Sequence, residues 1–544
     1  MFFAATERYG AGMKALPLGI QNFRKIIDGG YVYVDKTQFV YNLLNDSSYY
    51  FLSRPRRFGK SLLLDTIAEA FSGDKELFKG LWMYESDYAF EKHPVIRLDM
   101  SNVANGTPEI LMRSLLSRLR RIADDETLNI SEDLPSDMFQ HLIEALYKKY
   151  NQRVVVLIDE YDKPILDQLT KLETAEANRE VLRGFYGILK SMDPFLRMTF
   201  ITGVTKFTKT SIFSGLNNIR DITMSERYSN ICGVVTVDLE KYFGEHISHF
   251  SAKKRYADEA SFRDDILEWY DGYSWDGKSR VINPYSLLSF FSEGSFESFW
   301  YASGTPYFLI NLIKEKPSSF LVLNDFEISK RGLDTFEIRK MGLAPLLFQT
   351  GYLTVSEKRM RGVAESYLLK IPNLEVRESF YLSLISDYAE SDEEVTESAY
   401  WHIRDSLEAG DLQSVLDSMK GLFASIPYEL HIKHESYYHS IFFAIMNLLG
   451  FDIDAEVSVS GGRVDAVLEL ADKVYVMEFK YEHCAKDAAP EEKRELFDRA
   501  LEAGMKQIKD RGYAGKFAGS GKEVVLAAFA FLGRDDIEMV SETL

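Results

Sequence analysis

The sequence predicts an α/β protein with a parallel sheet, then a helical, winged-helix-like middle region, then a C-terminal α-β-β-β-α-β unit. Three observations support this fold class. Short apolar runs alternate with helical patterns over residues 49–240, which is typical of a parallel sheet. Residues 241–390 are aromatic and mostly helical, and a clear order of helices and strands begins at residue 435. The domains that follow from these shifts are 1–240, 241–398 and 399–544.

Length and composition set the broad class. A chain of 544 residues is too long for one core, and its 46% hydrophobic and 27% charged residues are ordinary for a globular protein. The longest apolar run, "VVLAAFAFL" at 524–532, is too short to span a bilayer. The N-terminus lacks the basic and apolar regions of a secretory signal, and two cysteines, Cys232 and Cys484, exclude a disulfide framework. We therefore expect a cytoplasmic protein without a membrane partner.

The net charge of -19 bears on the partners of the protein. Contacts to phosphates need lysine and arginine, so this charge argues against a protein that coats nucleic acid through bulk electrostatics. A local basic channel remains compatible with it.

The first region contains five apolar runs that predict strands. They lie at 49–55, 94–101, 153–160, 197–205 and 231–238. Between them stand segments such as "SLLLDTIAEAFSG", whose apolar residues have helical spacing. Strand and helix therefore alternate along this region.

In the middle region, "APLLFQTGYLTV" (344–355) predicts a helix that runs through a glycine turn into a strand. The segment "SYLLKIP" (366–372) can pair with that strand, and a helix followed by a hairpin suggests a winged-helix-like unit. The acidic segment "AESDEEVTES" (389–398) is the best candidate for a linker.

The C-terminal region predicts one helix, three strands, a second helix and a last strand. These elements lie at 435–450, 454–460, 463–470, 473–481, 492–513 and 523–533.

The stretch "SRPRRFGKS" (53–61) ends like a phosphate-binding loop. Gly59 would let the backbone approach phosphates, Lys60 would reach the β- and γ-phosphates, and the Ser61 hydroxyl would ligate Mg²⁺. The usual pattern has a glycine where this chain has Arg54. Taken alone, the stretch also fits a strand-to-helix turn with a solvated lysine.

The strand "RVVVLIDEYD" ends in adjacent carboxylates at the edge of the sheet where ligands bind. Asp159 would hold Mg²⁺, directly or through water, and Glu160 would polarise the attacking water. The alternative is a solvated acidic turn. The next strand ends in Thr202 and Thr205, which could sense the γ-phosphate, although threonine is common in strands.

The segments "GIQNFRKIIDGGYVYVDKT", "FLSRPRRFGKSLLLDTI", "VVVLIDEYDKP" and "ITGVTKFTKTSIFSGLNNIRDIT" together resemble the bacterial AAA-ATPase-like family. This resemblance implies a P-loop NTPase of the ASCE type with ATP and Mg²⁺ as cofactors, and Arg54 is part of that family's loop. It also places Tyr33, Asp35 and Lys36 just before the ATPase core. The nucleotide-binding residues expected from the motifs and the resemblance are Arg54, Arg56, Arg57, Phe58, Gly59, Lys60, Ser61, Asp159 and Thr205.

The role of the loop arginines stays open. Arg56 or Arg57 would either add positive charge at the phosphates or face a neighbouring subunit of a homo-oligomer.

A second group of charged residues lies in "GGRVDAVLELADKVYVMEFKYE". Strand alternation puts Glu478 and Lys480 on one face, and a hairpin would bring Asp465 close to Glu478. Phosphodiester hydrolysis uses such a set, because carboxylates hold Mg²⁺ or Mn²⁺ and a lysine positions water or stabilises developing charge. The alternative is a surface hairpin with an ordinary salt bridge.

Together with the surrounding element order, "GRVD…YVMEFK" resembles the PD-(D/E)xK nuclease superfamily, which has a restriction-endonuclease-like fold. Asp465, Glu478 and Lys480 match its core motif, with Val464 in place of the proline. The resemblance further implies a metal-binding acid on the first helix, Glu435, and a helical Gln507. It also implies nucleic acid, with DNA expected, as the partner.

Three functions fit these patterns. The first is an ATP-controlled, metal-dependent nuclease. The second is an ATP-dependent switch or partner-binding protein with an inactive nuclease fold, and the third is an NTPase that remodels proteins. The intact Asp465, Glu478 and Lys480 favour the first, whereas the net charge of -19 favours the others.

Overall fold

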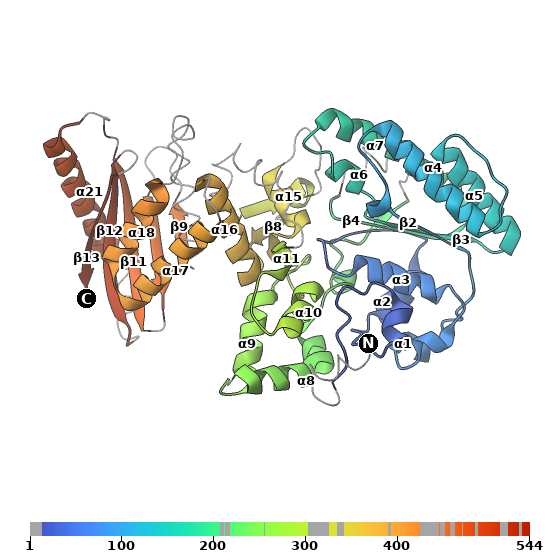
Figure 1. The fold of residues 1–544 in the computed structure, drawn as a ribbon, viewed down its shortest axis with the longest axis horizontal. Helices are drawn as coiled ribbons and strands as arrows, with labels where there is room; N and C mark the ends of the chain where they lie inside the picture. The colour runs from blue at the N-terminus through green and yellow to red at the C-terminus, as the bar shows by residue number, and fades with distance from the viewer. Residues whose placement is uncertain are drawn as a thin grey trace. The chain divides into compact units, whose positions relative to one another are not determined.

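The computed structural model describes most of the chain, and its elements are shown in Figure 1. The described residues are 13–206, 212, 218–254, 256–302, 326–333, 342–389, 393–424, 445, 452–456, 463–470, 472–482, 484, 488–511, 521–532 and 536–544. The chain divides into two compact units. The first comprises Met1–Gly304 with Asn324–Val376, and the second comprises Thr305–Leu323 with Arg377–Leu544.

A five-stranded parallel sheet forms the centre of the first unit. Its strands are β1 (Tyr49–Ser53), β2 (Val95–Asp99), β3 (Val154–Asp159), β4 (Leu196–Gly203) and β5 (Arg220–Asp221). They lie in the order β2-β3-β4-β1-β5, and each neighbouring pair is parallel. Since β4 separates β1 from β3, the loop after β1 and the acids after β3 lie on either side of it, as in an ASCE-type P-loop sheet. This confirms the predicted fold class.

The predicted fifth strand, 231–238, is wrong. Gly233 has a φ of +90°, and Val234 makes only an isolated bridge with Ile282. The helix α8 already begins at Thr236. The apolar run is buried as a loop, because burial requires apolar side chains whether or not the backbone pairs in a sheet.

Helices cover both faces of the sheet. The helices of this part are α1 (Phe23–Asp28), α2 (Thr37–Asp46), α3 (Lys60–Ala70), α4 (Pro108–Asp125), α5 (Pro135–Tyr150), α6 (Lys163–Leu166) and α7 (Leu172–Gly187). Figure 1 shows α1, α2 and α3 on one face and α4, α5 and α7 on the other. The 3₁₀ turns are η1 (Lys75–Phe78), η2 (Trp82–Glu85), η3 (Met100–Asn102), η4 (Ile188–Lys190), η5 (Asp193–Phe195) and η6 (Glu226–Tyr228).

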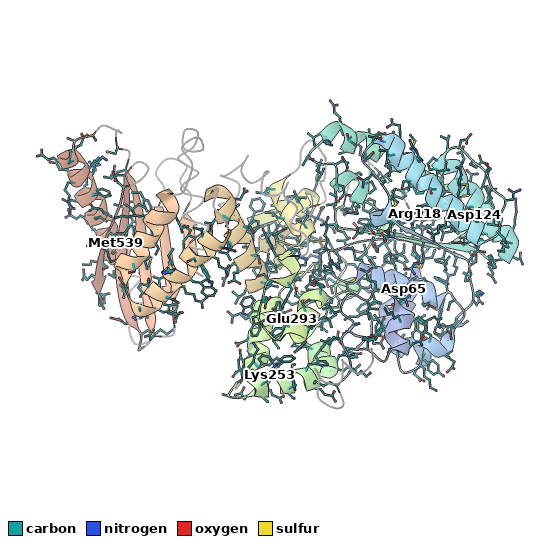
Figure 2. All side chains as sticks on the ribbon, viewed as in Figure 1. Asp65, Arg118, Asp124, Lys253, Glu293 and Met539 are labelled. Carbon is teal, nitrogen blue, oxygen red and sulfur yellow. The ribbon has the colours of Figure 1, made fainter. Side chains whose placement is uncertain are left out.

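The N-terminal segment is fixed to α3 by a buried carboxylate, Asp65 (Figure 2). Asp65 accepts hydrogen bonds from the backbone N–H of Phe23, at 2.5 Å, and from Nδ2 of Asn22, at 3.2 Å. It also forms an ion pair with Arg97 of β2. The segment that precedes the sheet is therefore held on the helix that follows the phosphate loop.

The rest of the first unit is helical with one small sheet. Its elements are α8 (Thr236–Lys254), α9 (Glu259–Tyr270), α10 (Pro284–Glu293), α11 (Phe299–Ala302), β6 (Phe326–Ser329), α14 (Lys330–Leu333), α15 (Leu343–Thr350), β7 (Thr354–Arg361) and β8 (Ala364–Lys370). The helix α15 ends at Gly351, whose φ is +98°, and β7 pairs antiparallel with β8. The predicted helix followed by a hairpin is confirmed, with β6 as a third strand.

The second unit holds a five-stranded sheet in the order β13-β12-β11-β10-β9. Its strands are β9 (Asp452–Glu456), β10 (Arg463–Glu469), β11 (Lys473–Glu482), β12 (Glu523–Leu532) and β13 (Asp536–Thr543). Its helices are α17 (Glu393–Ala409), α18 (Leu412–Ala424) and α21 (Pro490–Arg511). The pair β11–β12 is parallel, and the other pairs are antiparallel. The predicted element order from β9 to β12 is confirmed, and β13 is an additional edge strand.

The helix α16 (Leu374–Ala389) begins in the first unit and ends in the second. The predicted linker, 389–398, is helical from Glu393 on, because α17 begins there. An acidic start suits a helix, since its N-terminal dipole favours negative charge. Within the described ranges, no helix has the length and hydropathy needed to cross a bilayer.

Candidate functional site

The loop between β1 and α3 has the geometry of a phosphate-binding turn. Gly59 lies at the N-cap of α3 with a φ of +86°, a conformation that favours glycine. The N-terminal N–H groups of an α-helix can bind anions. Lys60 is buried, and its Nζ donates to the carbonyl oxygens of Arg54 and Pro55, both at 2.9 Å. Burial lowers the pKa of Lys60. The amine is thus held against the loop itself.

Three oxygen-bearing side chains meet at the carboxyl edge of the sheet. The Ser61 hydroxyl donates to Oδ2 of Asp159 at 2.5 Å, and the Thr202 hydroxyl donates to Oδ1 at 2.5 Å. The parallel order of β1, β4 and β3 brings these residues together, as the sequence predicts for Ser61 and Asp159. Hydroxyl and carboxylate oxygens are the donors that Mg²⁺ takes from proteins, so this pair fits that ion.

Glu160 follows Asp159 in a left-handed conformation, with a φ of 51°. Its backbone N–H donates to Oδ1 of Asp159 at 3.1 Å. Burial raises the pKa of Glu160, while the Lys60 ammonium opposes this rise. A carboxylate with a raised pKa is a better proton acceptor, so the environment of Glu160 suits a general base.

Asp162, by contrast, organises a loop. It is fully buried and accepts hydrogen bonds from the N–H of Val204 at 3.1 Å and from the N–H and hydroxyl of Thr205, both at 2.6 Å. Burial raises the pKa of Asp162 as well. Thr205 is therefore bound to Asp162, and Thr202 is the threonine that contacts Asp159.

Arg54 is not placed at the mouth of the loop. Its guanidinium is fully buried, 3.8 Å from the ring centroid of Trp275, and it donates to four backbone carbonyls. These belong to Ser53, Thr223, Tyr228 and Ser229. Burial lowers the pKa of Arg54 to about 10. In this structure Arg54 therefore supports the loop from within the core, and its expected contact to nucleotide stays a prediction.

The other residues of the loop point in different directions. Arg57 is exposed, with its guanidinium 5.0 Å from the ring centroid of Tyr285. Phe58 is buried against Tyr273, at a centroid distance of 4.8 Å, and Trp275. The carbonyl of Arg56 accepts a hydrogen bond from Nε1 of Trp300 at 3.2 Å. Aromatic residues that lie far along the chain therefore hold the loop.

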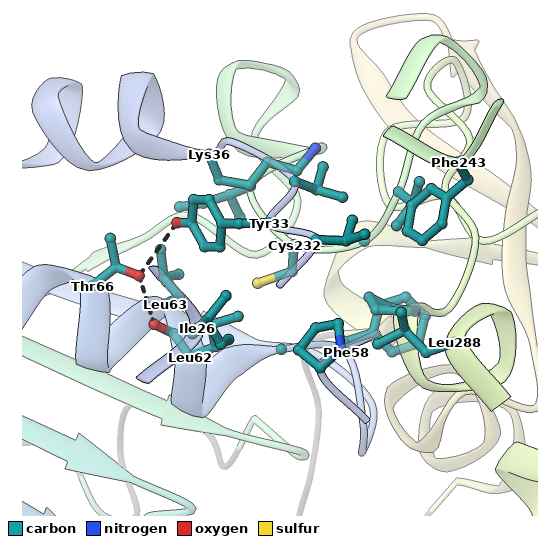
Figure 3. A pocket seen from close by; sticks show the side chains of 18 residues that line it. Ile26, Tyr33, Lys36, Phe58, Leu62, Leu63, Thr66, Cys232, Phe243 and Leu288 are labelled. Carbon is teal, nitrogen blue, oxygen red and sulfur yellow. Dashed lines mark hydrogen bonds between the residues drawn. The ribbon is translucent and has the colours of Figure 1, made fainter. Parts of the chain in front are cut away.

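An apolar pocket of about 110 Å³ lies beside the first turns of α3 (Figure 3). Its lining includes Gly59 and Phe58 of the loop, Leu62 and Leu63 of α3, and Cys232. The buried run that was predicted as a strand supplies one of its walls, from Ile231 to Val234. The remaining lining residues are Pro17, Ile26, Val32, Tyr33, Val34, Lys36, Thr66, Phe243, Pro284 and Leu288.

The segment before the sheet forms part of this pocket. The Tyr33 hydroxyl lies 3.4 Å from the hydroxyl of Thr66 on α3, and Lys36 forms a 2.7 Å ion pair with Asp238 of α8. Asp35 accepts the backbone N–H of Trp82 at 2.7 Å. The sequence suggested that this segment belongs with the ATPase core, but it gave no signal for the pocket, because these partners are distant in the chain.

The second candidate site lies on β11 and α21. Lys480 donates to Oε1 of Glu478 and to Oε1 of Gln507, both at 2.6 Å. Glu478 is buried, with 1% of its surface exposed. Asp465 of β10 stands directly opposite Glu478 in the antiparallel register. The hairpin that the sequence predicted is thus formed, and it brings the expected residues of β10, β11 and α21 to one place.

The structure bears on the predicted metal ligands in two further ways. Glu435 lies outside the described residues. Among the residues that are described, no three His, Cys, Asp or Glu side chains cluster in a way that could hold a metal ion. Mg²⁺ often takes only one or two protein carboxylates, with waters and substrate phosphates completing its shell, so a site of this kind needs no such cluster.

Comparisons with known proteins match both regions. Residues 17–213 match the family described as predicted AAA-ATPase, and residues 433–539 match the PD-(D/E)XK nuclease superfamily. A protein described as "Uncharacterized protein in vnfD 5'region", from Azotobacter chroococcum mcd 1, is 35% identical over 535 residues, which are 97% of this chain and 98% of the relative. These matches confirm the resemblances found in the sequence and support general ATPase and nuclease-like roles.

One solved structure, described as "Structure of the Aeropyrum Pernix ORC2 protein (ADPNP-ADP complexes)", covers 64% of this chain and 93% of its own. Its sequence identity is 11% and its TM-score is 0.24, and these values are too low to support a conclusion about this chain.

Proposed function

Because the chain belongs to the family of predicted AAA-ATPases that carry a C-terminal PD-(D/E)XK nuclease superfamily region, we propose that it is an ATPase that controls a metal-dependent nuclease. ATP with Mg²⁺ would bind at the loop between β1 and α3. The nuclease would cleave phosphodiester bonds in nucleic acid, and DNA is the substrate we propose.

The observation that carries the ATPase is the hydrogen bond between Ser61 and Asp159 beside the buried Lys60. Three groups that ATP-Mg²⁺ requires, a cation, a hydroxyl and a carboxylate, thus lie at the end of one helix and one strand. Bound Mg²⁺ would neutralise charge on the phosphates. Lys60 would exchange the carbonyls of Arg54 and Pro55 for phosphate oxygens. Glu160 would take a proton from the attacking water.

The apolar pocket suits the base of the nucleotide. It adjoins Gly59, where the phosphates would begin, and apolar walls favour burial of a planar aromatic ring. Tyr33 and Lys36 give the pocket its polar edge (Figure 3). We propose that the base of ATP occupies this space.

The binding test uses isothermal calorimetry on the full chain. Lys60→Ala removes a phosphate ligand and should weaken ATP binding by about tenfold or more, since hydrogen bonds to charged groups are the strong ones. Lys79→Ala, at an exposed lysine of the same unit, is the control. Equal ATP affinity in wild type and Lys60→Ala would remove the assignment of this site.

The nuclease rests on the pairing of Asp465 with Glu478 and on the amine of Lys480. Both carboxylates would hold Mg²⁺ or Mn²⁺, which supplies an activated water when bound. Gln507 holds the Lys480 amine from α21. The assay is cleavage of DNA and RNA with each metal, in the presence of ATP, ADP or no nucleotide. Cleavage that survives Asp465→Ala would discard the site, and cleavage that ignores nucleotide would discard ATP control.

An ATP-dependent switch with an inactive nuclease fold is the second candidate. Two observations favour it: the net charge of -19, and the short ion pair in which Lys480 already neutralises Glu478. A lack of cleavage on all of these substrates, with ATP binding intact, would make the switch the better explanation. A homo-oligomer and a cytoplasmic location stay predictions from the sequence.

A further inference from the structure

Trp300 connects the phosphate loop with the start of α16. Its indole Nε1 donates to the carbonyl of Arg56 at 3.2 Å, and its backbone N–H donates to Oε1 of Glu375 at 2.7 Å. Trp300 is itself buried, with 6% of its surface exposed. A single residue of the short helix α11 therefore holds the backbone of the loop on one side and a helix start on the other.

Glu375 lies in the first turn of α16 and is fully buried. It also accepts the hydroxyl of Ser286 on α10 at 2.9 Å, and its carbonyl accepts the hydroxyl of Ser298 at 3.3 Å. These bonds fix the beginning of α16 in the first unit. The same helix continues past Val376, where the second unit begins.

The packing between the loop and Trp300 leaves little slack. A Cβ added at Gly351 would lie 2.8 Å from Pro55 and 3.1 Å from the Trp300 ring, which are distances too short for ordinary contact. The Trp300 ring also packs against Tyr352, at a centroid distance of 5.2 Å. We therefore expect a shift in the backbone of residues 54–56 to be passed on to Trp300 at this contact, because close-packed interiors transmit displacement.

We propose that Trp300 is a positioning residue that couples the nucleotide state of the phosphate loop to the first turn of α16. The inference rests on the proposed binding of ATP at this loop. The Lys60 amine is bound to the carbonyls of Arg54 and Pro55, directly before Arg56. A phosphate competes for this amine and releases both carbonyls, so the backbone next to Arg56 rearranges. Trp300 carries that rearrangement to Glu375 through its two hydrogen bonds.

The test is hydrogen exchange of the full chain, followed by mass spectrometry, with and without ATP-Mg²⁺. In wild type, ATP should slow exchange about twofold or more both in peptides that cover residues 54–61 and in peptides that cover Leu374–Phe380, because ordered backbone opens less often. Trp300→Phe keeps an aromatic ring and the backbone N–H but removes the indole donor. In this variant the loop should still respond to ATP, while the response of α16 should be lost.

Trp269→Phe is the matched control, since it makes the same change on α9, where Trp269 packs against Phe296. It should leave both responses in place. Glu375→Leu removes the other end of the connection and should also abolish the response of α16, which gives a second route if Trp300→Phe does not fold.

Each outcome has a distinct meaning. If wild type shows a response in the loop but none in α16, or if the response of α16 persists in both Trp300→Phe and Glu375→Leu, the coupling role is overturned. If the loop of wild type shows no response to ATP, the proposed nucleotide site fails first, and the coupling fails with it. Loss of the α16 response in these variants, with the loop response retained, supports the inference.

Discussion

The hydroxyl of Ser61 donates a 2.5 Å hydrogen bond to Oδ2 of Asp159, which joins the first turn of α3 to the end of β3. Thr202, from the strand that lies between β1 and β3, occupies the other oxygen of the same carboxylate. Three segments that are distant in the sequence thus share one carboxylate. The sheet thus holds together the oxygens that would surround Mg²⁺.

We expect Asp159→Asn to weaken the binding of ATP-Mg²⁺ by about tenfold or more, because it removes the charge that faces the cation while keeping the shape of the side chain. Asp99→Asn is a matched control, since Asp99 ends β2 directly beside Asp159 in the register. Calorimetry with and without Mg²⁺ measures the ATP affinity of both variants. If Asp159→Asn lost affinity equally in the absence of Mg²⁺, Asp159 would not act through the metal.

We expect Glu160→Gln to bind ATP with nearly unchanged affinity but to hydrolyse it about 100-fold more slowly, because the amide cannot accept a proton from water. The pH dependence of the hydrolysis rate should also have a defined direction. Burial raises the pKa of Glu160, so the wild-type rate should rise as the pH increases through a value above that of an ordinary glutamate. Steady-state release of phosphate measures both predictions, and an unchanged rate in the variant would place the base elsewhere.

We expect Arg54→Lys to lower the free energy of unfolding of the first unit by about 2–4 kcal/mol, because lysine cannot reach several buried carbonyls in a planar arrangement. Arg57→Lys, two residues after Pro55 but exposed, should change it by less than about 0.5 kcal/mol. Chemical denaturation followed by circular dichroism is the measurement. Equal effects of the two substitutions would contradict the structural role of Arg54.

Much of the site could be predicted from local patterns. An apolar run that ends in polar residues identified β1, β3 and β4, and the parallel arrangement then required Ser61 and Asp159 to share an edge. Strand alternation likewise placed Glu478 and Lys480 on one face. These inferences succeeded because each strand could be identified from its own residues, and the general rules of strand pairing and alternation then placed the side chains.

Local patterns did not predict the remaining features. The run at 231–238 is buried without strand pairing, and periodicity alone cannot distinguish burial by a sheet from burial by a loop. The contacts of Arg54 could not be predicted, because the sequence does not reveal that Trp275 covers its guanidinium. The edge strand β13 was missed because its outer half is exposed and polar. The bridge partner of Val234 and the ring over Arg54 lie far along the chain, whereas β13 pairs with the strand directly before it.

We expect stability to depend on the ionisation of Glu375. Burial raises the pKa of Glu375 to about 7, so the folded state binds a proton that the unfolded chain releases near 4.5. Stability from this group is therefore present at low pH and is lost as the pH rises from about 4.5 to 7. A tenfold change in a protonation equilibrium corresponds to about 1.4 kcal/mol. The difference between pKa values of about 7 and 4.5 therefore sets an upper limit of about 3 kcal/mol on this change in the free energy of unfolding.

The comparison of wild type with Glu375→Gln isolates this effect, because the amide keeps an oxygen for the Trp300 and Ser286 donors but does not titrate. Tyr273 faces the same carboxyl, and its own pKa is raised far beyond this range by burial. The stability of Glu375→Gln relative to wild type should increase between pH 5 and pH 8. Glu394→Gln, at an exposed position of α17, should show no such trend. The prediction would be refuted if the stability of wild type and that of Glu375→Gln changed with pH in parallel.

The last prediction concerns Lys480, whose amine is shared by Glu478 and Gln507. Lys480→Met keeps the aliphatic volume and removes the charge that would stabilise the transition state of cleavage. We expect metal binding to be retained while the cleavage rate falls by about 100-fold or more. Lys522→Met, which removes a surface ion pair with Glu469, is the control and should cleave at the rate of wild type.

Because Glu478 is buried, Lys480→Met should also lower the thermal stability of the second unit when metal is absent, and added Mn²⁺ should restore part of that stability. Metal binding is measured by calorimetry, stability by thermal unfolding, and rate by single-turnover cleavage. Full activity in Lys480→Met would exclude the amine from the chemistry, whereas loss of metal binding would assign it to the structure of the site.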